Sequence, residues 1–286
     1  MHPYIQSLRL RTLPLSVSGI ILGTGIADVH LSPFTFQLST FIWALLTTLS
    51  LQILSNLANE LGDALKGTDT DQHGRAAYGL QTGAVTPKEI RNLIILFAVL
   101  SVGFGVALIY SAFGSLFCMQ SWIFYGLGLL AIIGAVTYTL GRHSYGYIGL
   151  GDLGVFVFFG LLSTCGAYYL QTQTMTLEVV LCGAAIGFPC VGVLNLNNIR
   201  DMVNDRKHGK CTFASLLGPT GARIYHTALL VGCLAIFAAY GQFWTLCVVP
   251  VWAWHLWYLW THSERLDRHM PVLMFSTLVV SLLAVG

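Results

Sequence analysis

Long intervals without a charged side chain restrict the fold of this chain more than any other feature. Residues 92–141 and 224–263 form uncharged intervals of 50 and 40 residues. A membrane-spanning helix needs about 20 mostly apolar residues, so each interval has room for two. Charged residues make up 9% of the chain, against about 25% in soluble domains. This composition excludes a soluble domain, a disordered chain and a nucleic-acid-binding protein, which needs a basic face.

The other uncharged intervals bring the predicted number of spanning helices to nine. Each of them holds one span, although 12–27 is somewhat short and must extend past Asp28, and turns fall where Pro, Gly and polar residues gather. The sequence therefore predicts an all-α, polytopic membrane protein in which residues 1–286 form a single transmembrane domain. The nine spans lie in 12–27, 29–59, 92–141 (two), 153–177, 179–199, 224–263 (two) and 270–286.

The distribution of Lys and Arg predicts the orientation in the membrane. Nine spans put alternate loops on opposite sides, and all 14 Lys and Arg residues fall on the side of the N-terminus. Because cytoplasmic loops carry the excess of Lys and Arg, we expect a cytoplasmic N-terminus in the cell (inner) membrane. The same rule places two Asp-rich windows, at about 60–91 and 200–223, in cytoplasmic loops.

Amides and carboxylates recur at helical spacing where these two windows begin. Gln52, Asn56, Asn59 and Asp63 are spaced i, i+4, i+7 and i+11, which places them on one helix face. Asn198, Asp201 and Asp205 share a face in the same way. Asn59-Glu60-x2-Asp63 and Asn197-Asn198-x2-Asp201 also match each other at a constant offset of 138 residues. Four predicted spans separate the motifs, so both polar helix ends reach the same membrane surface.

Carboxylates clustered with amides favour a hard divalent cation, most naturally Mg²⁺. Mg²⁺ in proteins usually binds through carboxylates and the phosphate oxygens of a substrate. Nearby cations can neutralise the remaining phosphate charge; the candidates are Lys66, Arg142, Arg200, Arg206, Lys207 and Lys210. Above an apolar bundle that suits a lipid tail, this pattern predicts an isoprenyl diphosphate substrate. The structural alternative is helix capping followed by a solvated loop.

Four segments resemble the UbiA superfamily of intramembrane prenyltransferases, which have nine helices and two Asp-rich motifs. The likeness extends to its 1,4-dihydroxy-2-naphthoate polyprenyltransferases of menaquinone biosynthesis. Two departures from the usual superfamily pattern concern the first motif: Glu60 stands where Asp is usual, and the third acid is Asp69, whereas many relatives have it at the position of Gly67. The segments that carry the resemblance are 11–16, 52–59, 145–160 and 197–210.

This resemblance implies Mg²⁺-dependent transfer of a polyprenyl chain from its diphosphate to 1,4-dihydroxy-2-naphthoate, with decarboxylation, at the cytoplasmic surface. It implies metal ligation by Asn59, Asp63, Asp69, Asp201 and Asp205. The substrate-binding residues it implies are Arg11, Asn56, Asn59, Lys66, Arg142, Asn198, Arg200 and Lys210. The catalytic residues it implies are Asp63, Asp201, Asp205, Tyr138 and Asp152.

Several alternatives remain open at the level of sequence. Arg11 either pairs with the naphthoate carboxylate or anchors the chain at the membrane surface, and Asp152 either orients the acceptor, acts as a base or caps a helix. The acceptor is dihydroxynaphthoate or another aromatic compound of the 4-hydroxybenzoate or homogentisate type. A cation or metabolite transporter is a different class, but it would carry polar residues near the middle of the membrane.

Overall fold

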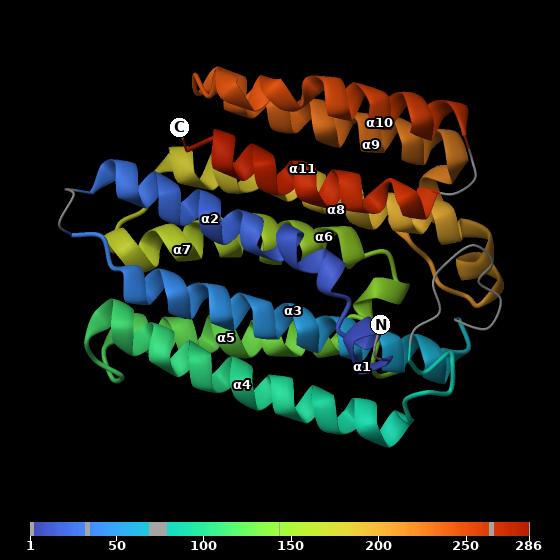
Figure 1. Ribbon diagram of the computed structural model, residues 1–286, viewed down its shortest axis with the longest axis horizontal. Coiled ribbons are helices and arrows are strands. Elements are labelled where there is room, and N and C mark those ends of the chain that lie inside the picture. Colours follow the sequence, from blue (N-terminus) through green and yellow to red (C-terminus); the bar gives the residue numbers. More distant parts are fainter. Residues whose placement is uncertain (1–2, 32–34, 69–78, 143, 263–265, 286) are drawn as a thin grey trace.

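The computed structural model describes residues 3–31, 35–68, 79–142, 144–262 and 266–285. Within these ranges the regular structure is helical, apart from an isolated bridge between Ile148 and Cys211. Figure 1 shows the long helices lying side by side with roughly parallel axes. The α-helices are α1 (Pro3–Ser7), α2 (Leu13–His30), α3 (Leu38–Lys66), α4 (Pro87–Phe113), α5 (Met119–Thr137), α6 (Gly151–Val155), α7 (Ser163–Thr172), α8 (Leu177–Lys207), α9 (Phe213–Ala239), α10 (Val249–Thr261) and α11 (Met270–Leu283).

Five shorter elements connect or extend these helices. Four are 3₁₀ turns, and η3 is a π-helix between α6 and α7. Such wide turns inside helices are frequent at functional sites. The five elements are η1 (Leu10–Thr12), η2 (Tyr145–Tyr147), η3 (Phe156–Leu162), η4 (Phe243–Val248) and η5 (Leu266–Arg268).

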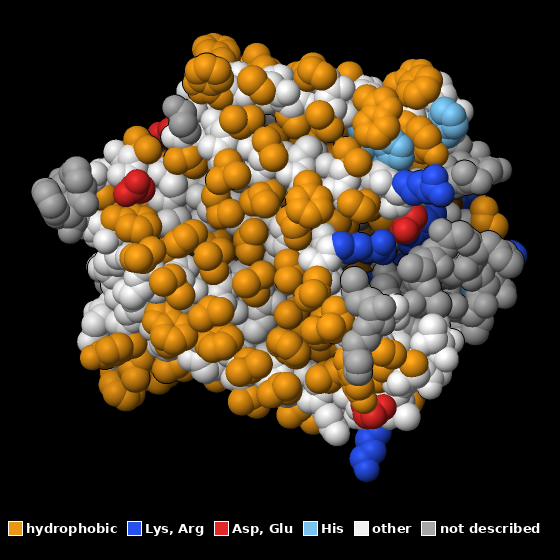
Figure 2. Space-filling view, viewed as in Figure 1, with side chains coloured by type: hydrophobic (Ala, Val, Ile, Leu, Met, Phe, Trp, Pro, Cys, Tyr) orange, Lys and Arg blue, Asp and Glu red, His pale blue; other side chains and the backbone are white. Residues whose placement is uncertain are grey.

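The helices agree closely with the predicted spans. Among the described residues, eight helical stretches are long and apolar enough to cross a membrane. The remaining predicted span, in the second half of 224–263, is divided between η4 and the 13-residue α10. The all-α polytopic fold is therefore confirmed, with eight full-length spans and one shorter helical segment. Figure 2 shows apolar side chains over the middle of the molecule and the visible Lys and Arg at one end.

The window 200–223 is mostly helical, which corrects its prediction as a loop, and the window 60–91 begins within α3 and ends within α4. Helix α3 continues to Lys66, and α8 continues to Lys207 before α9 begins at Phe213. Of the window 200–223, only residues 208–212 lie outside these helices. The polar side chains of each helix project from one face. The last turns can therefore carry several amides and carboxylates and keep their helical backbone hydrogen bonds. Gly67 ends α3 with a positive φ of 72°, a conformation that favours glycine.

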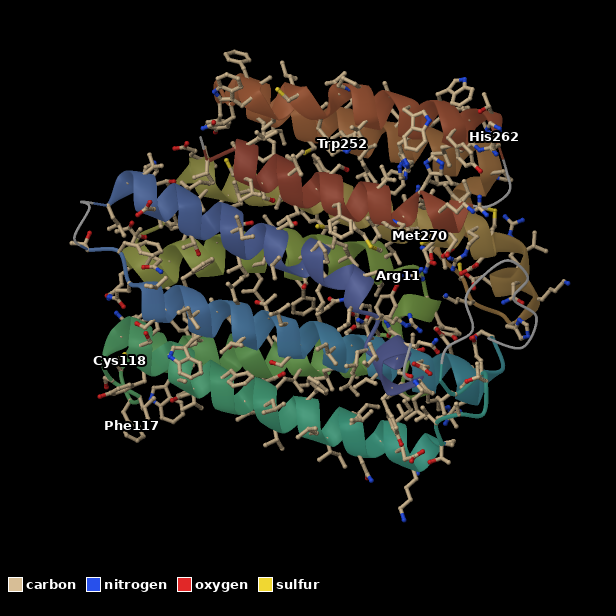
Figure 3. All side chains as sticks on the ribbon, viewed as in Figure 1. Arg11, Phe117, Cys118, Trp252, His262 and Met270 are labelled. Carbon is tan, nitrogen blue, oxygen red and sulfur yellow. The ribbon has the colours of Figure 1, made fainter. Side chains whose placement is uncertain are left out.

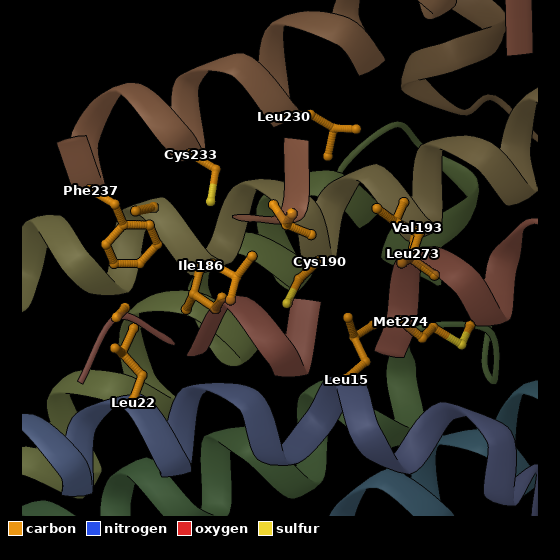
Figure 4. Close-up of a cluster of buried hydrophobic side chains, with 14 of the residues drawn as sticks. Leu15, Leu22, Ile186, Cys190, Val193, Leu230, Cys233, Phe237, Leu273 and Met274 are labelled. Atoms are coloured by element: carbon orange, nitrogen blue, oxygen red, sulfur yellow. The ribbon is translucent and has the colours of Figure 1, made fainter. Parts of the chain in front are cut away.

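The largest buried cluster lies where α2, α8, α9 and α11 meet (Figure 4). Leu22, Ile186 and Phe237 are completely buried there. Glycines bring the neighbouring η3 close to α8: a Cβ added to Gly160 would lie 2.6 Å from Gly187 Cα and 2.7 Å from Gly183 O. Small residues allow this close backbone approach in membrane bundles. This contact holds η3, which lines the functional cavity, against α8.

We expect Gly160→Ala to destabilise the fold, because backbone atoms occupy the space of the new methyl group. Overpacking of this kind typically costs about 1–3 kcal/mol. Gly126→Ala on α5 is the matched control, since no neighbouring atom lies within 4 Å of the place that its new methyl group would take. Thermal unfolding in detergent should show a lower midpoint for the first variant alone. Equal midpoints in the two variants would contradict this account of the η3–α8 contact.

Candidate active site

A cavity of about 330 Å³ lies between α2, α3, α4, α5, η3, α7 and α8. On α3 its lining runs from Ala44 to Asp63, positions 19 residues apart. At 1.5 Å per residue this corresponds to about 28 Å along the helix axis, close to the hydrocarbon thickness of a bilayer. Most of the lining is apolar, including Leu108, Phe124 and Leu170, and the carboxylates gather at one end. The cavity therefore suits an amphipathic molecule with one charged end.

The ends of α3 and α8 build the polar end of this cavity. The structure brings both predicted helix faces to the same cavity, in agreement with the expectation that the two polar helix ends reach the same membrane surface. The Nδ2 atom of Asn204 on α8 donates to Thr68 O just beyond α3, at 2.7 Å, and joins the two helix ends. The residues of the two faces that line the cavity are Gln52, Asn56, Asn59 and Asp63 from α3, and Asn197, Asn198, Asp201 and Asp205 from α8.

Glu60 points away from this cavity, although it neighbours Asn59 in sequence. It is completely buried, and its Oε1 accepts hydrogen bonds from Ser7 Oγ at 3.1 Å and from Leu80 N at 2.9 Å. One helical residue is a rotation of about 100°, which separates Glu60 from the face that carries Asn59 and Asp63. Glu60 therefore attaches α1 and the segment before α4 to α3. The expected ligand Asp69 lies outside the described residues.

The amide side chains on α3 form hydrogen bonds with different segments of the chain. Asn56 Nδ2 donates to Leu8 O and to Thr12 Oγ1, both at 3.0 Å. Gln52 Nε2 donates to the same Thr12 hydroxyl at 3.0 Å. Thr139 Oγ1 lies 3.1 Å from Asn59 Oδ1, to which it donates. Asn56 and Gln52 thus hold the chain before α2, while Asn59 is oriented by the end of α5.

Tyr147 connects the two helix ends and was not assigned a role from the sequence. Its hydroxyl donates to Asp63 Oδ1 at 2.8 Å and lies 3.0 Å from Thr68 Oγ1. The Lys66 and Lys210 ammonium groups lie 3.7 and 5.4 Å from its ring centroid. Burial raises the pKa of Tyr147, and the Asp63 carboxylate raises it further. The phenol therefore remains protonated at neutral pH and keeps donating to Asp63.

Four of the cations that were predicted to bind substrate have different positions. Lys210 lines the cavity and pairs with Asp205 Oδ1 at 3.3 Å. Lys66 donates to Ser144 Oγ and lies over Tyr147, outside the cavity lining. Arg142 is exposed and does not line the cavity. Arg200 also lies outside the lining and binds protein groups instead. Of the four, only Lys210 stands directly at the cavity.

A smaller pocket of about 140 Å³ adjoins the main cavity. The two share Arg9, Gln52 and Asn197 among their lining residues. Arg11 lines only the smaller pocket, and its Nη1 lies 3.4 Å from Asp267 Oδ2. Figure 3 shows Arg11 at the start of α2, near Met270 of α11. The apolar walls include Leu15, Cys190, Val193 and Met274, which Figure 4 shows between α2, α8 and α11.

Arg9 and the aromatic residues near the polar end are the other notable features. Arg9 lines both pockets and has a positive φ of 50°; its role was not predicted. Tyr138 lines the main cavity, and its ring meets that of Tyr145 edge to face at 5.2 Å. Two aromatic rings therefore flank the polar end of the cavity.

Asp152 does not line the main cavity, so it would not touch a substrate bound there, although its predicted catalytic role assumes such a contact. The Tyr225 hydroxyl hydrogen-bonds to its side chain, and its Oδ2 has no partner among the described residues. Its alternative as an N-cap is also wrong, because Leu150 occupies that position of α6. Asp152 lies behind the site, on the first turn of the helix that leads into η3.

The donor set at the polar end fits a magnesium–diphosphate group. Asp205 is 2% exposed, and its Oδ2 has no hydrogen-bond partner among the described residues. Such a buried oxygen is costly unless it binds a ligand. Within the described residues, no three His, Cys, Asp or Glu side chains form a ready-made metal site. Mg²⁺ does not require one, because waters and substrate phosphates complete its coordination.

Residues 18–281 match the UbiA prenyltransferase family. The chain belongs to this family. It is 42% identical over 253 residues, covering 88% of this chain and 79% of its relative, to an Escherichia coli (strain K12) protein named 1,4-dihydroxy-2-naphthoate octaprenyltransferase. It is 37% identical to a Haemophilus influenzae protein of the same name, with 98% and 94% of the two chains covered.

Solved structures support the same fold for this family member. The apo structure of a UbiA homolog from Aeropyrum pernix K1 aligns with a TM-score of 0.63 at 19% identity, covering 99% of both chains. The structure of a UbiA homolog from Archaeoglobus fulgidus bound to DMAPP and Mg²⁺ aligns with a TM-score of 0.62 at 16% identity, covering 98% of this chain and 86% of that one. At these identities the likeness concerns the fold.

We expect Asp205→Asn to lose ligand binding without losing stability, because Asn keeps an oxygen for Lys210 and removes a buried charge whose second oxygen has no partner among the described residues. In the wild type, Mg²⁺ with inorganic diphosphate should raise the unfolding midpoint; saturation at 100 times Kd contributes about 2.7 kcal/mol. The variant should unfold at the wild-type temperature or above and show little shift. Asp28→Asn, at the exposed end of α2, is the control and should shift normally. A full shift in Asp205→Asn would exclude this carboxylate as a ligand.

Proposed function

We propose that this protein transfers a polyprenyl chain from polyprenyl diphosphate to 1,4-dihydroxy-2-naphthoate, with loss of CO₂, giving demethylmenaquinol for menaquinone biosynthesis. The observation that carries the proposal is a cavity with carboxylates and amides from α3 and α8 at one end and an apolar lining along its remaining length. A prenyl diphosphate likewise has a charged end, the diphosphate, and an apolar tail, the prenyl chain. The names of the relatives that are 42% and 37% identical support the naphthoate acceptor.

Asp63, Asp201 and Asp205 would hold the magnesium ion, with Asn59 and Asn198 beside them. When bound, Mg²⁺ neutralises the diphosphate and makes it a better leaving group. Lys210 adds a positive charge at the same end of the cavity, where low polarity strengthens its attraction to phosphate. Tyr147 keeps Asp63 oriented through its hydrogen bond of 2.8 Å. The Mg²⁺ bound in the Archaeoglobus fulgidus homolog supports this assignment.

The reaction needs charge stabilisation rather than a covalent nucleophile. The allylic C–O bond breaks, and diphosphate leaves with the electron pair. The ring carbon that carries the carboxylate forms the new C–C bond. That carboxyl group then leaves as CO₂ and returns its bonding electrons to the ring. The Tyr138 and Tyr145 rings stand beside the polar end, where aromatic faces stabilise a developing cation.

The smaller pocket is our candidate subsite for the acceptor. Its apolar walls suit a flat aromatic ring, and Arg9 and Arg11 at its lining suit the acceptor's carboxylate. It opens onto the main cavity through shared residues, so a ring held there can face the allylic carbon. Arg142 is exposed and lines neither pocket, so it has no role in this arrangement.

We place the polar end of the site at the cytoplasmic face of the cell (inner) membrane. The support is the position of all 14 Lys and Arg residues on the predicted cytoplasmic side. A transporter is disfavoured, because the polar lining gathers at one end and does not continue through the apolar interior. Transfer to a different aromatic acceptor is the nearest remaining alternative, and product analysis distinguishes it.

Membranes that contain the protein should convert dihydroxynaphthoate and a polyprenyl diphosphate to demethylmenaquinol when Mg²⁺ is present. Product mass and released CO₂ are the measurements. EDTA should abolish turnover and added Mg²⁺ restore it, because the site carries three carboxylates around the diphosphate. In sealed vesicles, a membrane-impermeant chelator should inhibit only inside-out preparations. Turnover after exhaustive chelation, or a product from 4-hydroxybenzoate alone, would contradict the proposal.

Asp63→Asn should reduce prenyl transfer at least about 10²-fold, the scale of a major electrostatic contact in a transition state. Glu60→Gln is the matched control, because Gln keeps an oxygen for Ser7 and Leu80 and the side chain lies outside the cavity. Its turnover should fall far less. The comparison is made at saturating Mg²⁺ and equal protein level. A nearly normal Asp63→Asn variant beside an inactive Glu60→Gln variant would show that the wrong face of α3 had been chosen.

A further inference from the structure

Arg200 has no N–H group left for a substrate, which changes its predicted role. A guanidinium has five N–H donors. Its Nε donates to Asp201 Oδ1 at 2.7 Å, and its Nη2 donates to Asp201 Oδ2 and Asn197 Oδ1, both at 2.5 Å. Its Nη1 donates to Asp267 Oδ1 at 2.7 Å and to Met270 Sδ at 3.6 Å. Arg200 therefore positions Asp201 and Asn197 and does not bind phosphate itself.

Asp267 is the acid that holds Arg200 from the opposite side. It lies on η5, between α10 and α11, and its side chain is 18% exposed. Its second oxygen lies 3.4 Å from Arg11 Nη1. Arg11, Asp267, Arg200 and Asp201 thus form a chain of charges that alternate in sign. This chain joins residues that are far apart in the sequence.

The two ends of this chain belong to different pockets. Asp201 lines the main cavity, and Arg11 lines the smaller one. Asn197, which Arg200 also holds, lines both. Asp267 itself lines neither pocket. It can therefore influence bound molecules only through the two arginines.

We propose that Asp267 is a positioning residue that couples the metal–diphosphate end of the site to the acceptor pocket through Arg200 and Arg11. The inference rests on the proposed function for the identity of the two substrates. With the Asp267 charge present, Arg200 is held between the carboxylates of Asp201 and Asp267. Arg11 is held by Asp267 at the wall of the smaller pocket. Arg200 already donates to both Asp201 oxygens. Loss of the Asp267 charge leaves Asp201 as its one carboxylate partner, so Arg200 competes more strongly with the metal for Asp201, and Arg11 is released from its place beside the smaller pocket.

The test compares Asp267→Asn, Asp267→Glu and Asp28→Asn with the wild type in prenyl transfer. Asp28 is an exposed acid on α2 outside both pocket linings, so its variant should behave as the wild type. For Asp267→Asn we expect increases of about fivefold or more, the usual range of coupling between sites, in two quantities. These are the half-saturating Mg²⁺ concentration and the KM for dihydroxynaphthoate. Asp267→Glu, which keeps the charge, should restore part of both.

Arg11→Gln separates the two branches of the coupling. In the Arg11→Gln background, Asp267→Asn should no longer change the KM for dihydroxynaphthoate, because that effect acts through Arg11. It should still raise the half-saturating Mg²⁺ concentration, because that effect acts through Arg200. Additive changes in KM would overturn the proposal. So would wild-type Mg²⁺ dependence in Asp267→Asn, or a loss of kcat alone that Asp267→Glu does not rescue.

A binding measurement distinguishes failure of this inference from failure of the proposed function. Mg²⁺ with inorganic diphosphate should raise the unfolding midpoint of the wild type more than that of Asp267→Asn, whichever acceptor the enzyme uses. If dihydroxynaphthoate is not prenylated but this difference persists, the coupling to the metal end stands and the acceptor is wrong. An equal shift in both proteins would overturn the coupling whatever the acceptor.

Discussion

The cost of placing carboxylates at the edge of an apolar helix bundle determines how this protein is built. A charge in a low-polarity environment must be paired or hydrogen-bonded, and one left alone is expensive. Asp63 accepts a hydrogen bond from the Tyr147 hydroxyl, Asp201 accepts hydrogen bonds from the Arg200 guanidinium, and Asp205 pairs with Lys210. Each of these partners comes from a loop or helix end at the same end of the bundle. These hydrogen bonds and ion pairs do not use every lone pair of the three carboxylates, so lone pairs remain that can bind a metal ion.

The long helices explain how one site serves a substrate with two very different ends. Helices α3 and α8 extend the membrane-crossing segments by about two turns, and those turns carry the amides and acids. The same helices continue into the apolar interior, where α3 lines the cavity as far as Ala44. A diphosphate and its polyprenyl tail can therefore bind along one continuous surface. Close packing of Gly160 against Gly183 and Gly187 holds η3, which also lines the cavity, against α8.

The uncharged intervals of the sequence were sufficient to predict the spans, and helical spacing was sufficient to predict the two polar faces. Asn59 and Asp63 line the cavity while Glu60 does not, in agreement with a rotation of about 100° per residue. Roles that depend on contacts between distant segments were not predictable in this way. Arg200 lies one position before Asp201, yet its partner Asp267 is 67 residues away. Tyr147 lies within the family-like segment 145–160, but its bond to Asp63 exists only because η2 reaches the end of α3.

The central claim is that α3 and α8 hold one metal–diphosphate group between them. A structure of the purified protein with Mg²⁺ and a non-reactive prenyl thiodiphosphate tests it most directly. The account predicts an ion about 2.1 Å from oxygens of Asp63 and of Asp201 or Asp205, bound to the diphosphate, with the prenyl tail extending toward Ala44. An ion held by only one of the two helices, or a diphosphate outside the cavity, would contradict the account.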